Sequence, residues 1–204
     1  MSRGRFIVFE GPDGSGKSTQ AGRLTAALEG RGAAVLMTRE PGGTPIGEKV
    51  RELLLDARNT AMDRRTELLL YMASRAQLVA EILQPALDAG RLVVCDRYVY
   101  SSLVYQGYAG GLDQEEIARI GAFATAGLVP DLVLVVDVDP ATGLRRRGRV
   151  LDRMEQQSLT FHARVREGFL GLAARDPGRF RVVDGSAAAD AVFARVMTEV
   201  GRVL

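Results

Sequence analysis

The chain has 204 residues, of which 47% are hydrophobic and 25% charged, and its formal net charge is +2. These values are ordinary for a folded protein with a sizeable core, so we expect one domain over residues 1–204. The small net charge gives no global basic field, and no apolar run approaches the ~20 residues that cross a bilayer. We therefore expect neither a nucleic-acid partner nor a membrane partner.

A cytoplasmic location is expected from two features. The only cysteine, Cys95, cannot form an intrachain disulfide, which suits a reducing compartment. The first residues lead into an apolar strand without the core of a signal peptide. Cys95 stands within an apolar run, which indicates a small buried residue.

Five short runs rich in Val and Ile alternate with segments that have helical spacing. Unbroken hydrophobicity is typical of a strand that is buried on both faces. The alternation predicts an α/β fold with a parallel sheet covered by helices on both sides, and ligands at the carboxyl ends of the strands. The predicted strands are 6–9, 33–37, 92–95, 132–137 and 180–183.

The segments between the strands predict the helices. A long helix is expected over 64–89, with a kink near its end at Pro85. Two further helices are expected over about 158–175 and 187–203. The helix after the second strand should have an apolar face made of Ile46, Val50, Leu53 and Leu54.

Residues 9–19 read Phe-Glu-Gly-Pro-Asp-Gly-Ser-Gly-Lys-Ser-Thr and fit the phosphate-loop (P-loop) pattern between a strand and a helix. Glycines let successive N–H groups form an anion-binding concavity, and the first turn of the following helix adds more donors. Lys17 should reach the β- and γ-phosphates, and the Ser18 hydroxyl should bind Mg²⁺. The residues expected to bind ATP are Gly11, Pro12, Asp13, Gly14, Ser15, Gly16, Lys17, Ser18 and Thr19.

An acid and an arginine directly follow the third predicted strand. Asp96 resembles the Walker B acid that holds Mg²⁺, directly or through water; the alternative is a salt-bridged strand end. Arg97 and Arg39 both come from strand-end loops, where they can hold an acceptor phosphate bidentately. This placement favours phosphoryl transfer between two nucleotides.

A second cluster of arginines lies at 145–153 and predicts a mobile lid over about 145–157; a solvated charge run is the alternative. Cations that close over the donor stabilise the charge of the transferred phosphoryl group. The acceptor oxygen of a phosphate is already ionised near neutral pH, so no general base is required. The predicted catalytic residues are Lys17, Arg97, Arg147, Arg149 and Arg153.

Together these motifs resemble the thymidylate kinase (dTMP kinase) family over nearly the full chain. The resemblance implies a P-loop NTPase fold of the nucleoside monophosphate kinase type, with a five-stranded parallel sheet and a short lid. It implies ATP-dependent phosphorylation of dTMP to dTDP, on the route to dTTP, with Mg²⁺ and by a homodimer. The stretches that carry it are 9–19, 38–44, 96–98 with Ser101, 105–107 and 151–155.

The resemblance also implies roles for single residues. The Asp13 carboxylate would contact the 3′-hydroxyl of the acceptor, and Tyr105 would crowd its 2′ position. Tyr71 replaces a Phe that stacks on thymine, Arg75 would hydrogen-bond the base, and Ser102 could also contact it. The residues expected to bind dTMP are Asp13, Arg39, Tyr71, Arg75, Arg97, Ser102, Tyr105 and Gln106.

The P-loop contains no arginine, which resembles the subtype, common in bacteria, whose catalytic arginine lies in the lid. Which lid arginine touches the phosphoryl group stays open. Asp152 and Glu155 would hold metal or orient the lid, or would merely balance its arginines. The predicted metal ligands are Ser18, Asp96, Asp152 and Glu155.

Two alternative functions remain from the residues. The first is another nucleoside or deoxynucleoside monophosphate kinase. The second, from a different class, is a nucleotide-switch ATPase that hydrolyses ATP slowly without an acceptor.

Overall fold

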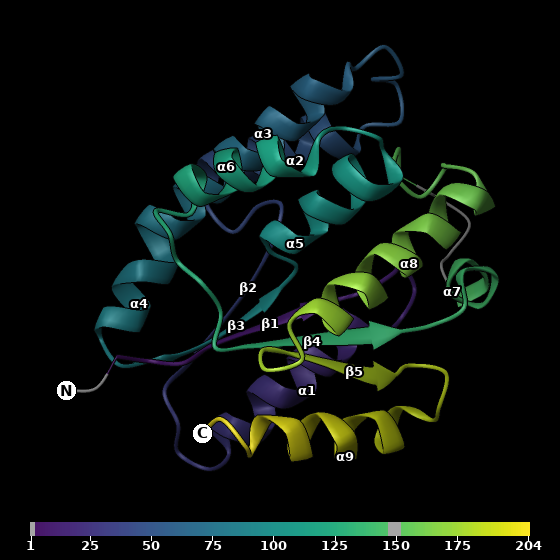
Figure 1. Ribbon diagram of the computed structural model, residues 1–204. Helices are drawn as coiled ribbons and strands as arrows, with labels where there is room; N and C mark the ends of the chain where they lie inside the picture. The colour runs from purple at the N-terminus through teal and green to yellow at the C-terminus, as the bar shows by residue number, and fades with distance from the viewer. Residues whose placement is uncertain (1–2, 147–151) are drawn as a thin grey trace.

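The computed structural model describes residues 3–146 and 152–204, and its centre is a five-stranded parallel sheet of order β2-β3-β1-β4-β5 (Figure 1). The prediction of a parallel sheet with these five strands is confirmed. β1 pairs with both β3 and β4, so the P-loop leaves the middle of the sheet's carboxyl edge. The strands are β1 Phe6–Glu10, β2 Val35–Arg39, β3 Leu92–Asp96, β4 Leu132–Asp137 and β5 Phe180–Asp184.

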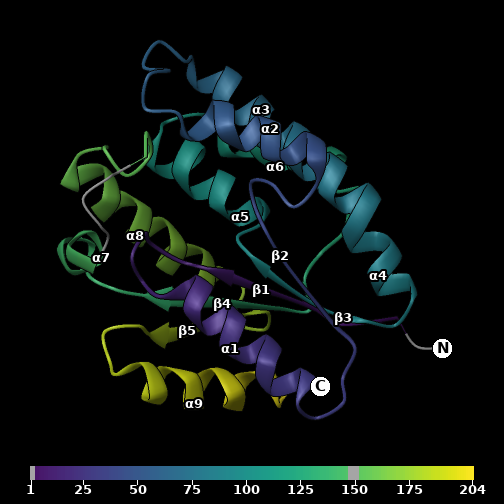
Figure 2. The ribbon, with the colours of Figure 1, turned by 180° about the vertical axis from the view of Figure 1, so that it is seen from behind.

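Helices cover both faces of the sheet, as Figures 1 and 2 show. Ile7 and Phe9 of β1 pack in the core under α1 and α9, whereas Phe6 and Val8 belong to the core on the other face. This alternation follows from the period of a strand, in which successive side chains point to opposite faces. The helices are α1 Lys17–Glu29, α2 Pro45–Leu55, α3 Arg64–Leu78, α4 Gln84–Asp88, α5 Val99–Ser102, α6 Gln114–Ala124, α7 Pro140–Arg146, α8 Leu159–Arg175 and α9 Ala189–Val200, with π-helical segments η1 Val79–Leu83 and η2 Leu103–Ala109.

The predicted long helix over 64–89 is divided into α3, η1 and α4. The π-helical η1 lies directly before the turn that contains Pro85. Proline has no N–H to donate and its ring crowds the carbonyl four residues earlier, so a regular ladder cannot continue through it. The predicted irregularity at Pro85 therefore takes the form of a wider turn upstream of the proline.

The predicted apolar face of α2 is only partly buried. Leu54 is inaccessible, but Ile46 and Leu53 are each 53% exposed. Leu69 of α3 and Phe123 of α6 are also exposed, at 55% and 89%. Within the described residues, no helix has the length and apolar character needed to cross a membrane.

Candidate active site

The P-loop is shaped by glycines at the carboxyl edge of the sheet. Gly11 and Gly14 have φ angles of 131° and 71°, in the region that favours glycine. A Cβ at Gly11 would lie 2.3 Å from the carbonyl oxygen of Val136, and one at Gly14 would lie 2.0 Å from that of Gly143. The loop is thus pressed against β4 and α7, and its curvature requires glycine at both positions.

Lys17 and Ser18 begin α1 and face the cavity that the loop encloses. The Lys17 Nζ donates to the Pro12 carbonyl oxygen at 2.8 Å, and only 6% of the residue is exposed. Burial, followed by the positive charge of the nearby Arg97, lowers the pKa of Lys17 to about 8. Because the Lys17 ammonium is buried and bound to a loop carbonyl, it is well placed to exchange that carbonyl for a phosphate oxygen.

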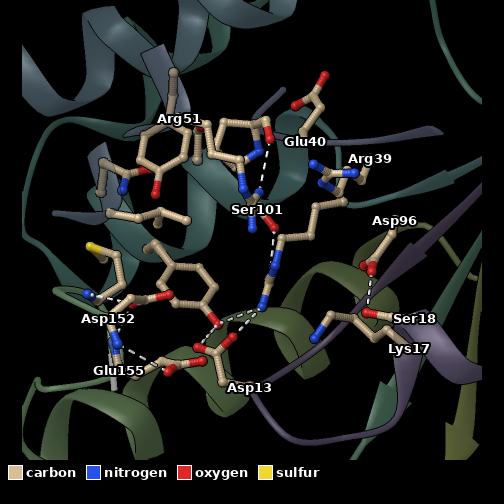
Figure 3. A pocket seen from close by; sticks show the side chains of 18 residues that line it. Asp13, Lys17, Ser18, Arg39, Glu40, Arg51, Asp96, Ser101, Asp152 and Glu155 are labelled. Atoms are coloured by element: carbon tan, nitrogen blue, oxygen red, sulfur yellow. Dashed lines mark hydrogen bonds and ion pairs between the residues drawn. The ribbon is translucent and has the colours of Figure 1, made fainter. Parts of the chain in front are cut away.

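The donor atoms around Asp96 fit a magnesium ion. The Ser18 hydroxyl hydrogen-bonds Asp96 Oδ2, as Figure 3 shows. The other carboxylate oxygen, Asp96 Oδ1, is buried and has no hydrogen-bond partner within the described part of the chain. Mg²⁺ prefers oxygen ligands and commonly uses one or two carboxylates together with substrate phosphates and water. A hydroxyl beside an unsatisfied carboxylate oxygen suits that pattern.

Arg97, Asp13 and Tyr105 form a compact cluster across the cavity from Lys17. The Arg97 Nη2 lies 2.5 Å from Asp13 Oδ1 and donates to the Tyr105 hydroxyl at 3.2 Å. The Tyr105 hydroxyl in turn donates to Asp13 Oδ2 at 2.7 Å. Arg97 has a φ of 74°, which is unusual outside glycine and is typical of functional sites that store strain. Three residues predicted to bind dTMP are therefore brought together by β3, the P-loop and η2.

One pocket extends from Lys17 and Ser18 past this cluster to the helices above the sheet (Figure 3). Its far wall includes Tyr71 of α3, with Ser102 and Gln106 of the α5–η2 segment. Burial raises the pKa of the Tyr71 phenol, so its hydroxyl stays neutral at physiological pH. Arg39 also lines the pocket and pairs with Glu48 at 3.1 Å, in a half-exposed position.

Arg75 lies behind this wall rather than on it. It is 1% exposed, and its Nε and Nη2 contact Glu40 Oε2 at 2.7 and 2.6 Å. Its Nη1 donates to Ser102 Oγ at 3.1 Å. Burial raises the pKa of the Glu40 carboxyl to about 7, and this outweighs the opposing effect of Arg75. Arg75 therefore contacts two residues that line the pocket, Glu40 and Ser102, but does not line the pocket itself.

The remaining predicted residues belong to the predicted lid over about 145–157. Arg147 and Arg149 lie outside the described residues. Arg153 does not line the pocket: its Nη2 pairs with Glu67 at 2.5 Å and its Nε donates to the Leu54 carbonyl at 2.9 Å. Glu67 also accepts from Gln106 Nε2 at 2.7 Å. Arg153 thus connects this segment to α2, α3 and η2.

Asp152 and Glu155 line the pocket on the side opposite Ser18 and Asp96 in the view of Figure 3. Asp152 Oδ1 accepts from the Glu155 N–H at 3.0 Å, and Glu155 Oε2 accepts from the Asp152 N–H at 3.2 Å. This reciprocal pattern is that of a capping box. Of the four predicted metal ligands, Ser18 and Asp96 adjoin each other, whereas Asp152 and Glu155 form a separate pair.

Two charged residues of the pocket, Glu40 and Arg51, were not predicted as site residues. Arg51 of α2 donates to the Pro41 carbonyl at 2.9 Å, and burial followed by the charge of Arg39 lowers its pKa. Its only sequence signal is position, because it stands one turn before the buried Leu54. Glu40 lies inside the 38–44 motif, but an acid there gives no sign that it faces an arginine from another helix.

A second cavity lies beside the P-loop. Ser15, Gly16 and Thr19 line one side of it, and Arg146 and Ala187 line the other. The Arg146 Nη1 donates to the Gly185 carbonyl at 2.8 Å, which ties α7 to the loop after β5. The P-loop is therefore flanked by a cavity on each side.

Comparisons with known proteins agree with this geometry. The family model described as thymidylate kinase matches residues 9–196. The chain is 51% identical to a thymidylate kinase of Deinococcus radiodurans, with 98% of both chains covered. It is 48% identical to a thymidylate kinase of Solidesulfovibrio magneticus, covering 98% of this chain and 100% of the relative. The crystal structure of thymidylate kinase from Ehrlichia chaffeensis superposes with a TM-score of 0.81 at 32% identity, covering 97% of this chain and 99% of the other. The chain therefore belongs to the thymidylate kinase family.

Proposed function

We propose that the protein transfers the γ-phosphoryl group of ATP to the 5′-phosphate of dTMP and so forms dTDP and ADP. The observation that carries the proposal is the pocket that runs without interruption from the P-loop lysine to the cluster of Asp13, Arg97 and Tyr105. A donor phosphate at Lys17 and an acceptor phosphate at Arg97 would face each other within this pocket. Membership of the thymidylate kinase family supports the choice of substrates.

ATP would lie with its phosphates in the P-loop and its nucleoside toward the second cavity. Lys17 would release the Pro12 carbonyl and bind the β- and γ-phosphates. The cavity beside Ser15, Thr19 and Arg146 is the one next to the loop on the side away from Asp13 and Arg97. The guanidinium plane of Arg146 could stack on a purine ring there.

Mg²⁺ would be held by Ser18 and Asp96, where it would neutralise negative charge on the β- and γ-phosphates. The unsatisfied Asp96 Oδ1 supports this assignment. Asp152 and Glu155 already satisfy each other's N–H groups, so we assign them to the orientation of their segment.

dTMP would occupy the part of the pocket above Arg97. Asp13 would accept a hydrogen bond from the 3′-hydroxyl, and Arg97 with Arg39 would bind the 5′-phosphate. The exposed pair between Arg39 and Glu48 is weak, so Arg39 can turn to a phosphate at small cost. Tyr71 would stack on the base, while Ser102 and Gln106 would supply polar contacts at its edge.

Positioned cations supply most of the rate acceleration in this mechanism, because the transferred phosphoryl group carries spread negative charge. Lys17 and Arg97 approach it from the donor and acceptor sides. Roles for Arg147 and Arg149 in a lid over 145–157 stay predictions. The acceptor oxygen is ionised, so no general base is assigned; His162 is 2% exposed and packs against Phe161.

The proposal includes a homodimer formed through α2, α3 and α6. These helices lie together on one side of the molecule in Figures 1 and 2. Each of these helices carries a large exposed apolar side chain, namely Leu53, Leu69 and Phe123. We assign these side chains to the contact between the two subunits. Phe123→Glu should shift the mass measured by light scattering from dimer to monomer. A wild-type monomer at micromolar concentration would contradict this part.

The cytoplasmic location belongs to the same proposal. Cys95 is free and fully buried, and burial raises the pKa of its thiol, so it suits a reducing compartment without a structural disulfide.

A coupled assay of ADP release with dTMP, dUMP, dCMP, dGMP and AMP tests the activity. The proposal predicts the highest kcat/KM for dTMP. A preference for another acceptor would move the protein to a different monophosphate kinase specificity. ADP release that is equally fast without any acceptor would favour the nucleotide-switch ATPase.

A further inference from the structure

Glu10, the last residue of β1, is a fully buried acid that does not line the pocket. Its Oε1 accepts from the backbone N–H groups of Tyr98 and Ser101 at 2.9 and 3.1 Å. Its Oε2 accepts from the Ser101 hydroxyl at 2.6 Å. The residue at the N-cap position of α5, Tyr98, offers no side-chain cap of its own. Glu10, at the end of β1, therefore supplies the side-chain cap for the N-terminus of α5.

Ser101 transmits the effect of this carboxylate to Arg97. A hydroxyl has one proton, and that of Ser101 is donated to Glu10. The oxygen of the same hydroxyl accepts from Arg97 Nη1 at 3.0 Å. The direction of both hydrogen bonds follows from Arg97, because a guanidinium can only donate and takes the Ser101 oxygen as its acceptor, which leaves the Ser101 proton for Glu10.

The backbone of Arg97 is bound by Phe9, the residue before Glu10, and Tyr98 and Ser101 after it are bound by Glu10. Arg97 has a φ of 74°, and its N–H donates to the Phe9 carbonyl at 2.8 Å. The residues on which Glu10 acts directly, Tyr98 and Ser101, follow Arg97 in the chain. Glu10 thus restrains the turn that gives Arg97 its unusual conformation, as well as the acceptor at one end of its guanidinium.

We propose that Glu10 is a positioning residue for phosphoryl transfer, which acts through Ser101 and the first turn of α5 to aim Arg97 at Asp13 and the acceptor phosphate. This inference rests on the proposed function. Glu10 lines neither of the two cavities assigned to the nucleotides, and its hydrogen bonds lead to the reaction through Ser101 and Arg97. The nearest cationic end of Arg97, Nη2, meets Asp13 at 2.5 Å in the arrangement that Glu10 holds.

A neutral replacement of the same size should disturb this arrangement. In Glu10→Gln the amide oxygen can keep the two backbone N–H groups, whereas the NH₂ group, which donates hydrogen bonds and cannot accept them, would face the Ser101 hydroxyl. The Ser101 proton would then turn toward the Arg97 guanidinium, which offers no acceptor. Loss of a hydrogen bond to a charged group costs about 1.5–3 kcal/mol, which corresponds to about tenfold or more in an equilibrium constant.

The test measures kcat and the KM values for dTMP and ATP in wild type, Glu10→Gln, Ser101→Ala and the double variant. We expect the KM for dTMP to rise about tenfold or more in each single variant, with the KM for ATP nearly unchanged. Because both residues act through one chain of bonds, Glu10→Gln should have a much smaller effect in the Ser101→Ala background.

Asp113→Ala provides a matched control for the loss of capping alone. Asp113 caps α6 by accepting from the Glu115 and Glu116 N–H groups at 2.7 and 3.0 Å, away from the pocket. It should lower the melting temperature and leave the KM for dTMP as in wild type.

Three results would overturn the inference. Glu10→Gln that only lowers the melting temperature, with wild-type KM for dTMP, would make the role structural. If Glu10→Gln does not fold, wild-type kinetics in Ser101→Ala would likewise show that the role of Glu10 is structural. A wild-type protein that fails to phosphorylate dTMP contradicts the proposed function and removes this inference with it, whereas variants equal to an active wild type overturn the inference alone.

Discussion

The Arg75 guanidinium contacts a single oxygen of Glu40 with two of its nitrogens, at 2.7 and 2.6 Å, where the two side chains are 1% and 3% exposed. Removing both ions from water is costly, and their attraction offsets that cost only while both are present. Arg75 lies behind the wall of the pocket, and its partners Glu40 and Ser102 are part of that wall. The ion pair therefore links the stability of the fold to the shape of the proposed base site.

Breaking this ion pair from one side should be more damaging than removing it entirely. Glu40→Leu leaves a buried, unpaired guanidinium and should lower the free energy of unfolding by about 3–5 kcal/mol. Glu40→Leu combined with Arg75→Met removes both charges and should be more stable than Glu40→Leu alone. Urea denaturation measures both values, and strictly additive losses would contradict the coupling.

ATP affinity should depend on pH through Lys17. Burial lowers the pKa of Lys17 to about 8, so the free protein loses this charge as the pH rises through that value. Phosphates are already fully ionised there, since their second pKa is about 6. Titration calorimetry should therefore show ATP binding that weakens, and takes up protons, as the pH rises above about 8.

Lys17→Met is the control for this titration because it keeps the length of the side chain without the amine. Its ATP affinity should be low and should no longer change with pH in this range. An unchanged pH dependence in Lys17→Met would assign the titration to another group.

Tyr105 offers a test of the selection against ribonucleotides. It is 7% exposed, and its hydroxyl is bound by both Asp13 and Arg97. Tyr105→Ala should open space at the 2′ position and raise kcat/KM for the ribonucleotide relative to dTMP. Tyr105→Phe keeps the ring and loses only the hydroxyl, so it should retain the discrimination. Equal discrimination in Tyr105→Ala would reject the steric role.

Arg153 should act as an anchor of its segment rather than on the phosphoryl group. Its ion pair with Glu67 is nearly buried, with exposures of 11% and 10%. Arg153→Gln and Glu67→Gln should each cost on the order of 2 kcal/mol of stability, with non-additive losses in the double variant. Arg153→Gln and Glu67→Gln should change kcat by similar factors. A fall of about 10³ in kcat for Arg153→Gln alone would restore the predicted catalytic role.

The sheet and the P-loop were predictable because their signals are local. Strands buried on both faces read as unbroken apolar runs, and the glycines of the P-loop have a spacing dictated by backbone geometry. The sequence predicts residues 38–44 and 96–98 at strand ends, and parallel strands bring such ends to one edge. The meeting of Asp13 and Arg97 follows from that rule, whereas Tyr105 is brought to them by η2.

The parts that could not be predicted depend on tertiary pairing. Arg75 and Glu40 are 35 residues apart, and nothing local indicates that they bind each other behind the pocket wall. Arg153 lies among other arginines, so its distinct partner on α3 has no signature in the sequence. Ile46 and Leu53 read as core residues because helical periodicity cannot tell a core from an uncovered surface.

Product stoichiometry tests the central claim most directly. Protein incubated with ATP, Mg²⁺ and dTMP should yield dTDP and ADP in equal amounts, separated and quantified by ion-exchange chromatography. Without dTMP, ADP should form at no more than a small fraction of that rate. ADP formed without matching dTDP, or at the same rate without the acceptor, would contradict the assignment of phosphoryl transfer to dTMP.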